Sequence, residues 1–265
     1  MKSKLTGFGV CNYPGYMTNN KRVLILGGTG EAAALAAKIG EIPGVDAIAS
    51  FAGRTKEHIT LTTPSRTGGF GGATGLANYL RQEGIDFLID ATHPFAAQIS
   101  FNAAKAALDC DIPRLMLSRP AWEKVPGDHW IEVESNQAAA NILPGLAERI
   151  FLTIGRQELA SYAHLKDIWF LMRMIDSPEA DTPTPTGKLL LERGPFSLES
   201  DRSLLQDYQI GAIVSKNSGG DATYPKIIAA RELGITVVMV QRPPVPEGEK
   251  VADIKSVVAW LEKRF

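Results

Sequence analysis

The sequence predicts an α/β protein built from two parallel-sheet domains that are related by internal duplication, with a cleft between them. The main observation is a series of positions that recurs in the second half at nearly constant spacing: Leu80, Ile85, Asp90, Ile112 and Arg119 return as Leu205, Ile210, Ser215, Ile235 and Arg242. In both halves, short apolar runs alternate with helical patterns, which is typical of parallel strands covered on both faces. The duplication therefore predicts a functional site where the two sheets face each other.

Length and composition fit two globular domains. The chain has 265 residues, of which 45% are hydrophobic and 22% charged, and its formal net charge is -1. This balance gives no global field that would attract nucleic acid or an anionic membrane. No apolar run approaches the roughly 18 residues of a membrane-spanning helix. Cys11 and Cys110 show neither metal-binding spacing nor a disulfide framework, so we expect a reducing, cytoplasmic location.

The first domain is expected over residues 21–120, after a flexible N-terminal extension of residues 1–20. Its strands are short and continuously apolar, and its helices follow glycine-rich or polar turns. The expected strands are Arg22–Leu26, Asp46–Phe51, Phe87–Asp90 and Arg114–Leu117, and the expected helices are Glu31–Ile39, Ala73–Glu83 and Ala96–Leu108.

The second domain is expected over residues 121–265 and repeats this plan. An insertion around residues 165–188 interrupts the repeat, and its prolines indicate an exposed loop over residues 176–186. The closing strands of the two domains have matching positions, so each could pair in either sheet, and the sequence leaves this open. The other expected elements are the strands Trp130–Val133, Ile150–Thr153, Ala212–Val214 and Thr236–Val240, and the helices Gln137–Glu148, Tyr224–Leu233 and Asp253–Phe265.

A glycine-rich turn lies between the first strand and the first helix. Gly28, Gly30 and Ala33 form a G-x-G-x-x-A pattern there, which is typical of Rossmann-like nucleotide-binding domains. Glycine lets a diphosphate approach the backbone, and the helix N-terminus supplies N–H groups and partial positive charge. The turn predicts a cofactor site formed by Gly28, Thr29, Gly30, Glu31 and Ala32. The alternative is a tight strand-to-helix turn that binds no ligand.

The end of the second strand indicates which nucleotide binds. NAD-binding folds usually carry an acidic residue there for the ribose hydroxyls, but this chain has Arg54 and Thr55. A guanidinium can grip a 2′-phosphate with two hydrogen bonds. The pair therefore favours NADP(H) over NAD(H), and the alternative is that Arg54 is an ordinary surface arginine.

Polar residues also follow the third strand of the first domain. Thr92 and His93 come directly after Asp90, and Pro94 fits the first turn of the next helix. Thr92 is expected to contact the cofactor, and His93 could act as an acid or hydrogen-bond a ligand carboxylate. A structural turn is the alternative, and the residues alone do not decide between the two.

The counterpart of that turn in the second domain is the run Ser215–Gly220. Its small polar residues, one lysine and two glycines precede a helix, which is typical of an anion-binding loop, although glycines in a plain loop would look the same. Several arginines fall at expected strand ends and indicate a substrate with several carboxylates, although each alone could be solvated. The expected substrate-binding residues are Arg119, Arg156, Arg193, Lys216, Ser218, Gly219 and Gly220, with Arg173 and Arg242 as further cations.

One pattern is typical of a different family of enzymes. Tyr162 and Lys166 have the Y-x-x-x-K spacing of short-chain dehydrogenases, but that family needs a serine about 13 residues earlier, where Arg149 stands. We interpret both as ordinary helix residues. The four histidines share no ligand spacing with each other or with the cysteines, so no metal site is expected.

Together, these segments resemble the precorrin-6A reductase and cobalt-precorrin-6A reductase family of cobalamin (vitamin B12) biosynthesis. The resemblance covers about residues 21–250, and the glycine run with the turn after Asp90 is its most specific part. It is carried by Leu26–Ala32, Ala52–Arg54, Gly68–Gly72, Asp90–Ala96 and Ser215–Gly220.

The resemblance implies a cytoplasmic oxidoreductase that uses NADPH to reduce one double bond of the tetrapyrrole precorrin-6A, or its cobalt form, to precorrin-6B. No residue separates the two substrates. The cofactor supplies the hydride, and His93, then Lys216, or water is expected to supply the proton. A monomer or small homo-oligomer is expected. Two alternatives stay open: an NADP-dependent dehydrogenase of a small carbonyl compound, and a non-catalytic NADP-binding sensor.

Overall fold

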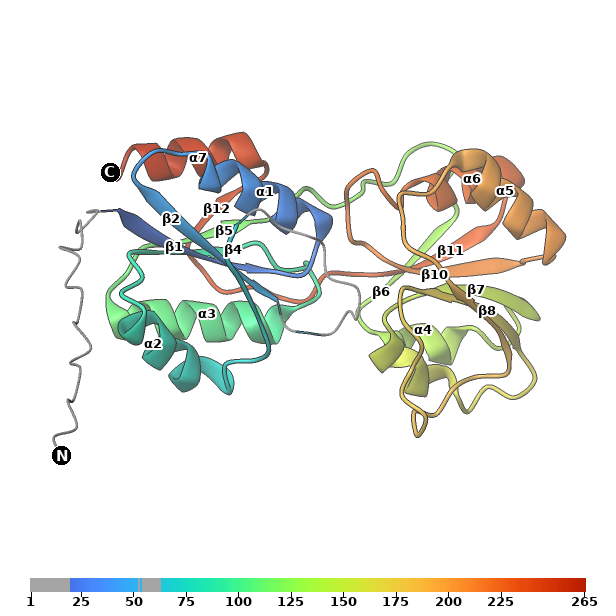
Figure 1. Cartoon of the computed structure of the whole chain (residues 1–265). Coiled ribbons are helices and arrows are strands. Elements are labelled where there is room, and N and C mark those ends of the chain that lie inside the picture. The colour runs from blue at the N-terminus through green and yellow to red at the C-terminus, as the bar shows by residue number, and fades with distance from the viewer. Residues whose placement is uncertain (1–19, 52, 54–62) are drawn as a thin grey trace, which may run out of the picture.

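The protein forms two lobes that lie side by side, each built around a six-stranded parallel sheet (Figure 1). The computed structural model describes residues 20–51, 53 and 63–265. The sheet orders are β12-β5-β4-β1-β2-β3 in the first lobe and β6-β11-β10-β7-β8-β9 in the second. This architecture confirms the predicted fold class. Of the extension expected over residues 1–20, all but residue 20 lies outside the described residues.

The first lobe has helices on both faces of its sheet (Figure 1). Alternate residues of β1 face opposite layers: Val23 and Ile25 pack on the α1 side, and Leu24 and Leu26 pack on the α2 and α3 side. This is the continuous apolar pattern of a strand buried on both faces. The elements are β1 (Lys21–Gly27), α1 (Gly30–Gly40), β2 (Val45–Phe51), β3 (Ser65–Thr67), α2 (Gly72–Gln82), β4 (Phe87–Asp90), α3 (Ala97–Cys110) and β5 (Arg114–Leu117).

The second lobe repeats this arrangement. α4 and the short 3-10 helix η1 cover one face of its sheet, and α5 and α6 cover the other. The elements are β6 (Trp130–Val133), α4 (Asn136–Ile142), β7 (Arg149–Thr153), η1 (Arg156–Tyr162), β8 (Trp169–Met174), β9 (Gly187–Leu191), α5 (Leu198–Asp207), β10 (Ala212–Lys216), α6 (Pro225–Leu233) and β11 (Thr236–Val240).

Strand pairing follows the duplication position for position. Asp90 on β4 pairs with Leu26 on β1, and Ser215 on β10 pairs with Thr153 on β7. One difference bears on function. The central strand of the first lobe leads into α1, a helix of 11 residues, whereas the central strand of the second leads only into η1. A long helix whose N-terminus faces the sheet edge at this position is therefore a feature of the first lobe alone.

The end of the chain returns to the first lobe. β12 (Glu249–Val251) pairs with β5, and α7 (Ile254–Glu262) lies beside α1 on the same face of the sheet (Figure 1). Val257 and Leu261 of α7 are buried in the core that α1 also covers. This differs from the expectation that residues 121–265 form the second domain. Only three residues of β12 pair, and two of them are charged, so the strand has no apolar signature. The closing strands β5 and β11 each pair within their own sheet.

The region predicted as an insertion contains two strands of the second sheet. β8 lies within residues 165–188 and β9 begins there, and β8 is almost wholly buried between β7 and β9. The prediction of an insertion over this whole range is therefore wrong. β8 and β9 hold the places in the second sheet that β2 and β3 hold in the first, so these residues are part of the repeat, and β8 is an apolar run that is typical of a buried strand. Residues 175–186, which hold the prolines, form the connection between the two strands.

Candidate active site

The glycine turn of the first lobe lies at the carboxyl edge of the sheet, as predicted. Thr29 caps α1, because its Oγ1 accepts a hydrogen bond of 3.0 Å from the Ala32 N–H. The φ angle of Gly28 is 143°, a conformation that other residues rarely adopt. A Cβ added at Gly28 or Gly30 would meet no heavy atom within 4 Å. The backbone of the turn is thus open to a ligand, and the first-turn N–H groups of the helix face the same region.

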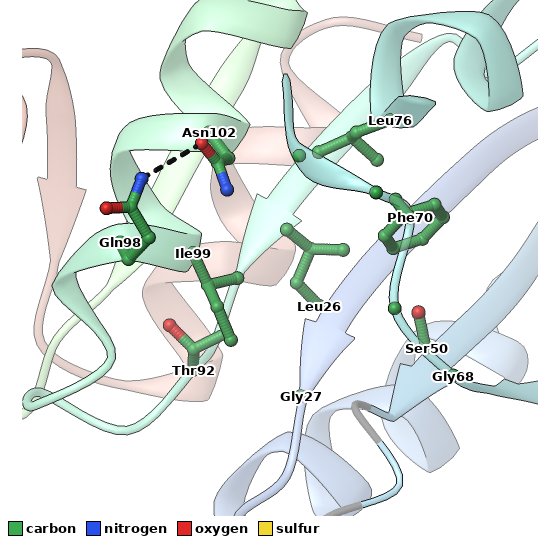
Figure 2. A pocket seen from close by; sticks show the side chains of 13 residues that line it. Leu26, Gly27, Ser50, Gly68, Phe70, Leu76, Thr92, Gln98, Ile99 and Asn102 are labelled. Carbon is green, nitrogen blue, oxygen red and sulfur yellow. Dashed lines mark hydrogen bonds between the residues drawn. The ribbon is translucent and has the colours of Figure 1, made fainter. Parts of the chain in front are cut away.

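A cavity of about 300 Å³ adjoins this turn (Figure 2). It lies over the carboxyl ends of β1, β2 and β4, beside the point where the strand order of the sheet reverses, which is the usual ligand position in open parallel sheets. Its volume is at the lower end of the range for small-molecule sites. Gln98 and Asn102 of α3 form a polar side, where the Gln98 amide donates to Asn102 Oδ1. The rest of the lining comprises Leu26, Gly27, Ser50, Gly68, Gly69, Phe70, Gly71, Gly72, Leu76, Thr92 and Ile99.

Arg66 on β3 organises the wall of this cavity, and the sequence analysis did not identify it as a site residue. Its Nη1 donates to Ser50 Oγ at 2.9 Å and to the Gly68 carbonyl at 3.0 Å, and its guanidinium carbon lies 3.9 Å from the centre of the Phe70 ring. These contacts fix the glycine-rich loop and place a cation at the carboxyl end of β2. Arg54 and Thr55, predicted to bind the 2′-phosphate, lie outside the described residues.

The turn after β4 carries Thr92 and His93, and hydrogen bonds hold both side chains. Thr92 donates from its N–H and its hydroxyl to Asp90 Oδ1, at 3.2 and 2.7 Å. His93 Nδ1 accepts from the Phe95 N–H at 3.2 Å, which leaves its proton on Nε2. Burial, together with the positive charges of Arg119, Lys216 and Arg242, lowers the pKa of His93 from 6.5 to about 3. His93 is therefore a neutral imidazole near pH 7.

Lys216 reaches this turn from the second lobe. It ends β10, its Nζ lies 2.5 Å from Glu158 Oε1, and the same Nζ is 5.1 Å from the centre of the Phe95 ring. Only 12% of the Lys216 side chain is exposed. The two predicted proton donors, His93 and Lys216, are thus brought to the same junction of the lobes. Sequence reasoning missed Glu158, because nothing local pairs a residue of η1 with the end of β10.

The loop Ser218–Gly220 packs on the segment that leaves the first lobe. Asn217 holds Trp122 with two hydrogen bonds, of 2.8 and 3.1 Å. Arg242, whose segment crosses back to the first lobe, donates to the carbonyls of Asn217, Ser218, Arg119 and Pro120. Burial and the charge of Arg119 lower the pKa of Arg242. Arg242 therefore connects two segments that pass between the lobes, its own and the one at Arg119 and Pro120, to the predicted anion-binding loop.

Gly219 is expected to be essential for this packing. Its φ is 67°, and a Cβ would lie 2.0 Å from the Pro120 carbonyl oxygen. Gly219→Ala should lower the free energy of unfolding by about 2–4 kcal/mol, measured by urea denaturation. Gly44→Ala is the matched control, since its φ is 77° and its Cβ would meet nothing within 4 Å. The free energy of unfolding of the control should fall by only about 1–2 kcal/mol, which is the cost of placing a non-glycine residue in the left-handed conformation. Equal losses would contradict the packing role.

The remaining predicted arginines occupy different environments. Arg156 at the start of η1 donates to the Ser177 carbonyl at 3.2 Å, and Arg193 is exposed after β9. Arg173 is buried, bonds Asp201 at 2.6 Å and stacks on Phe196. Arg173 is thus unavailable to a substrate.

Tyr162 and Lys166 do not form a catalytic pair. Tyr162 is fully buried and donates its hydroxyl hydrogen to Asn136 Oδ1, and burial raises its pKa, whereas Lys166 is exposed. Within the described ranges, no three His, Cys, Asp or Glu side chains are grouped to hold a metal ion. The helices of those ranges are also too short or too polar to cross a membrane.

An open glycine turn beside a cavity at a strand-order reversal is typical of α/β proteins that bind nucleotides, and in this chain a second parallel-sheet lobe adjoins the first. A family model described as "Precorrin-6x reductase CbiJ/CobK" matches residues 22–262. The chain belongs to this precorrin-6x reductase family.

Individual relatives agree with this assignment. The precorrin-6A reductase of Rhodococcus erythropolis is 49% identical over 241 residues, covering 91% of this chain and 97% of the relative. That of Rhodobacter capsulatus is 40% identical, covering 91% and 95%. The solved structure of the precorrin-6A reductase CobK is 39% identical, with a TM-score of 0.85 and coverage of 92% of this chain and 96% of that chain.

Proposed function

We propose that the protein uses NADPH to reduce a carbon–carbon double bond of metal-free precorrin-6A, giving precorrin-6B in cobalamin biosynthesis. One observation carries the proposal: the open glycine turn of the first lobe lies next to the basic loop of the second, because Arg119 pairs with Glu31 of the turn and also donates to the loop carbonyls of Ser218 and Gly219. A nicotinamide cofactor on the turn and an acidic macrocycle against the loop would therefore lie next to each other. Membership of the precorrin-6x reductase family supports the same reaction.

The relatives support the metal-free form of the substrate. Proteins named precorrin-6A reductase from four genera share 40–49% of their residues with this chain. Proteins named cobalt-precorrin-6A reductase, from Priestia megaterium and Methanothermobacter thermautotrophicus, share 28% and 31%. The chain is thus more similar to the relatives named for the metal-free tetrapyrrole.

The residues of the first lobe fit the cofactor. The turn from Gly28 to Ala32 has the open backbone that a diphosphate needs, and the helix N-terminus adds favourable charge. Arg54 and Thr55 follow β2 in the sequence, where a 2′-phosphate binds in NADP-dependent domains. Arg66 and Thr92 would lie on either side of the bound nucleoside. When bound, the cofactor supplies the hydride.

The residues of the second lobe fit a substrate with several carboxylates. Lys216, with the backbone of Ser218, Gly219 and Gly220, would bind the acid side chains nearest the junction, and Arg156 and Arg193 would meet those farther out. Holding the macrocycle against the nicotinamide in one orientation supplies much of the rate, since effective concentrations in such arrangements are very high.

The protonation state of His93 bears on the proton donor. A neutral imidazole with its proton on Nε2 can donate a hydrogen bond to the substrate, but few molecules carry the imidazolium at pH 7 when the pKa is about 3. This favours Lys216 over His93 as the side chain that protonates the carbon next to the reduced one. His93 would then help to orient the substrate.

Replacing Arg54 tests the choice of nucleotide. Arg54→Ala should raise the dissociation constant for NADPH by about 100-fold, because a few kcal/mol of guanidinium–phosphate pairing are lost. The dissociation constant for NADH should change less than about threefold. Arg81→Ala, at the C-terminal end of α2, is the control and should change neither. Equal weakening of both nucleotides would contradict the role of Arg54.

The reaction is tested by anaerobic incubation of the protein with NADPH and each form of precorrin-6A, followed by absorbance of the macrocycle. The proposal predicts conversion of the metal-free form at a rate at least about tenfold above the cobalt form. Turnover of a simple ketone instead would support a small-carbonyl dehydrogenase, and binding of NADPH without any turnover would support a sensor.

A further inference from the structure

Arg119 connects the predicted cofactor turn to the predicted substrate loop. Its Nη1 lies 3.1 Å from Glu31 Oε2, in the first turn of α1. Its Nε donates to the carbonyls of Ser218 and Gly219, at 2.9 and 3.1 Å. One guanidinium thus bonds an anion in the first lobe and the loop backbone of the second. Sequence reasoning expected Arg119 to bind substrate directly, but these contacts support a different role.

Glu31 is placed where a bound diphosphate would affect it. A carboxylate in the first helical turn is stabilised by the helix dipole, but it repels a second anion that arrives at the same helix end. Arg119 offsets that repulsion by pairing with Glu31. The side chains are only 20% and 28% exposed, so solvent screens this interaction less than it screens an ion pair at the open surface.

The backbone around Arg119 is firmly held. Arg242 donates to the carbonyls of Arg119 and Pro120 and also to that of Ser218. Gly220 lies so close to Arg119 that a Cβ there would be 3.0 Å from Arg119 Cδ. A change in the charge around the Arg119 guanidinium therefore acts on the loop through short, direct contacts rather than through a mobile linker.

We propose that Arg119 is a positioning residue that couples cofactor binding to the substrate loop. This rests on the proposed function, because it requires a diphosphate at the N-terminus of α1. A diphosphate there competes with Glu31 for the guanidinium, and the hydrogen bonds of Nε to Ser218 and Gly219 carry the response to the loop. Bound NADP(H) then strengthens binding of the tetrapyrrole, and by linkage the tetrapyrrole strengthens binding of NADP(H) to the same extent.

The coupling is measured with Glu31→Gln, which removes the carboxylate and keeps the shape of the side chain. In the wild type, saturating NADP⁺ should tighten binding of the reduced tetrapyrrole product by about tenfold, within the usual range of coupling. In Glu31→Gln this factor should fall below about twofold while NADP⁺ itself still binds. Arg119→Lys keeps the charge but loses the planar donor geometry, and should give an intermediate factor.

Hydrogen exchange of the backbone amides of residues 216–221 is a second measurement of the coupling, and it needs no substrate. NADP⁺ should slow exchange there in the wild type and have little effect in Glu31→Gln. Glu83→Gln is the control, since it removes the partner of Arg22 from a half-exposed ion pair and should behave as wild type. Wild-type coupling and wild-type exchange in Glu31→Gln would overturn the role of Arg119. Failure of the wild type to bind NADP⁺ at all would instead overturn the proposed function.

Discussion

Lys216→Met is expected to lower kcat by about 10²–10³-fold, the usual contribution of a general acid, while the dissociation constant for NADPH stays within about threefold of wild type. Methionine preserves much of the length of the side chain but can neither donate a proton nor pair with Glu158. Lys216 belongs to the second lobe and contacts the first at Phe95, so its loss should spare the cofactor turn. Single-turnover absorbance under anaerobic conditions measures the reduction step directly.

Two further variants separate the chemistry at Lys216 from its charge. Lys216→Arg retains a cation for substrate carboxylates but is a far weaker proton donor, so it should recover KM and not kcat. Glu158→Gln frees the ammonium from its ion pair and should leave kcat within about tenfold of wild type. A Lys216→Met variant that keeps at least a third of the wild-type kcat would show that water or another group supplies the proton.

Gly28→Val is expected to abolish measurable NADPH binding, with a rise in the dissociation constant of more than about 100-fold. Two effects combine: a β-branched residue is strained at a φ of 143°, and its side chain would occupy the open space over the turn. Valine at this position should also shift Thr29 and weaken the capping bond to the Ala32 N–H.

The control for backbone strain is Gly84→Val, after α2, where φ is 59° and a Cβ would meet nothing within 4 Å. It should lower the unfolding temperature, though less than Gly28→Val, because a φ of 59° lies in the left-handed region that other residues can adopt, and it should bind NADPH as the wild type does. If Gly28→Val bound NADPH with wild-type affinity, the glycine turn would not be the diphosphate site.

Much of the fold could be predicted because its signals are local. The strands of the first lobe are short apolar runs, and Gly28 marks the start of α1 by its place after the first strand. β12 and α7 were assigned to the wrong lobe because the apolar face of α7 fits either sheet, and only tertiary packing decides between them. The second sheet was incomplete because residues 165–188 were interpreted as an insertion, although β8 and β9 occupy the places of β2 and β3 in the repeat.

Only those residues of the candidate active site that lie within sequence motifs could be predicted. His93 and Lys216 were singled out separately, and the structure brings them to one junction. The pairing of Arg119 with Glu31, 88 positions apart, leaves no local trace, and neither does the contact between Arg66 and Ser50. The neutral state of His93 depends on burial and on three cations from distant segments, so spacing alone could not indicate it.

The most direct measurement of the central claim is label transfer. The protein is incubated anaerobically with precorrin-6A and NADPH that carries deuterium at either face of nicotinamide C4, and the product is analysed by mass spectrometry and NMR. The proposed reaction predicts that one face alone delivers its deuterium, to a single carbon of the macrocycle, and that the neighbouring carbon takes its hydrogen from solvent. A product whose new hydrogens both come from solvent, or the absence of any product, would contradict it.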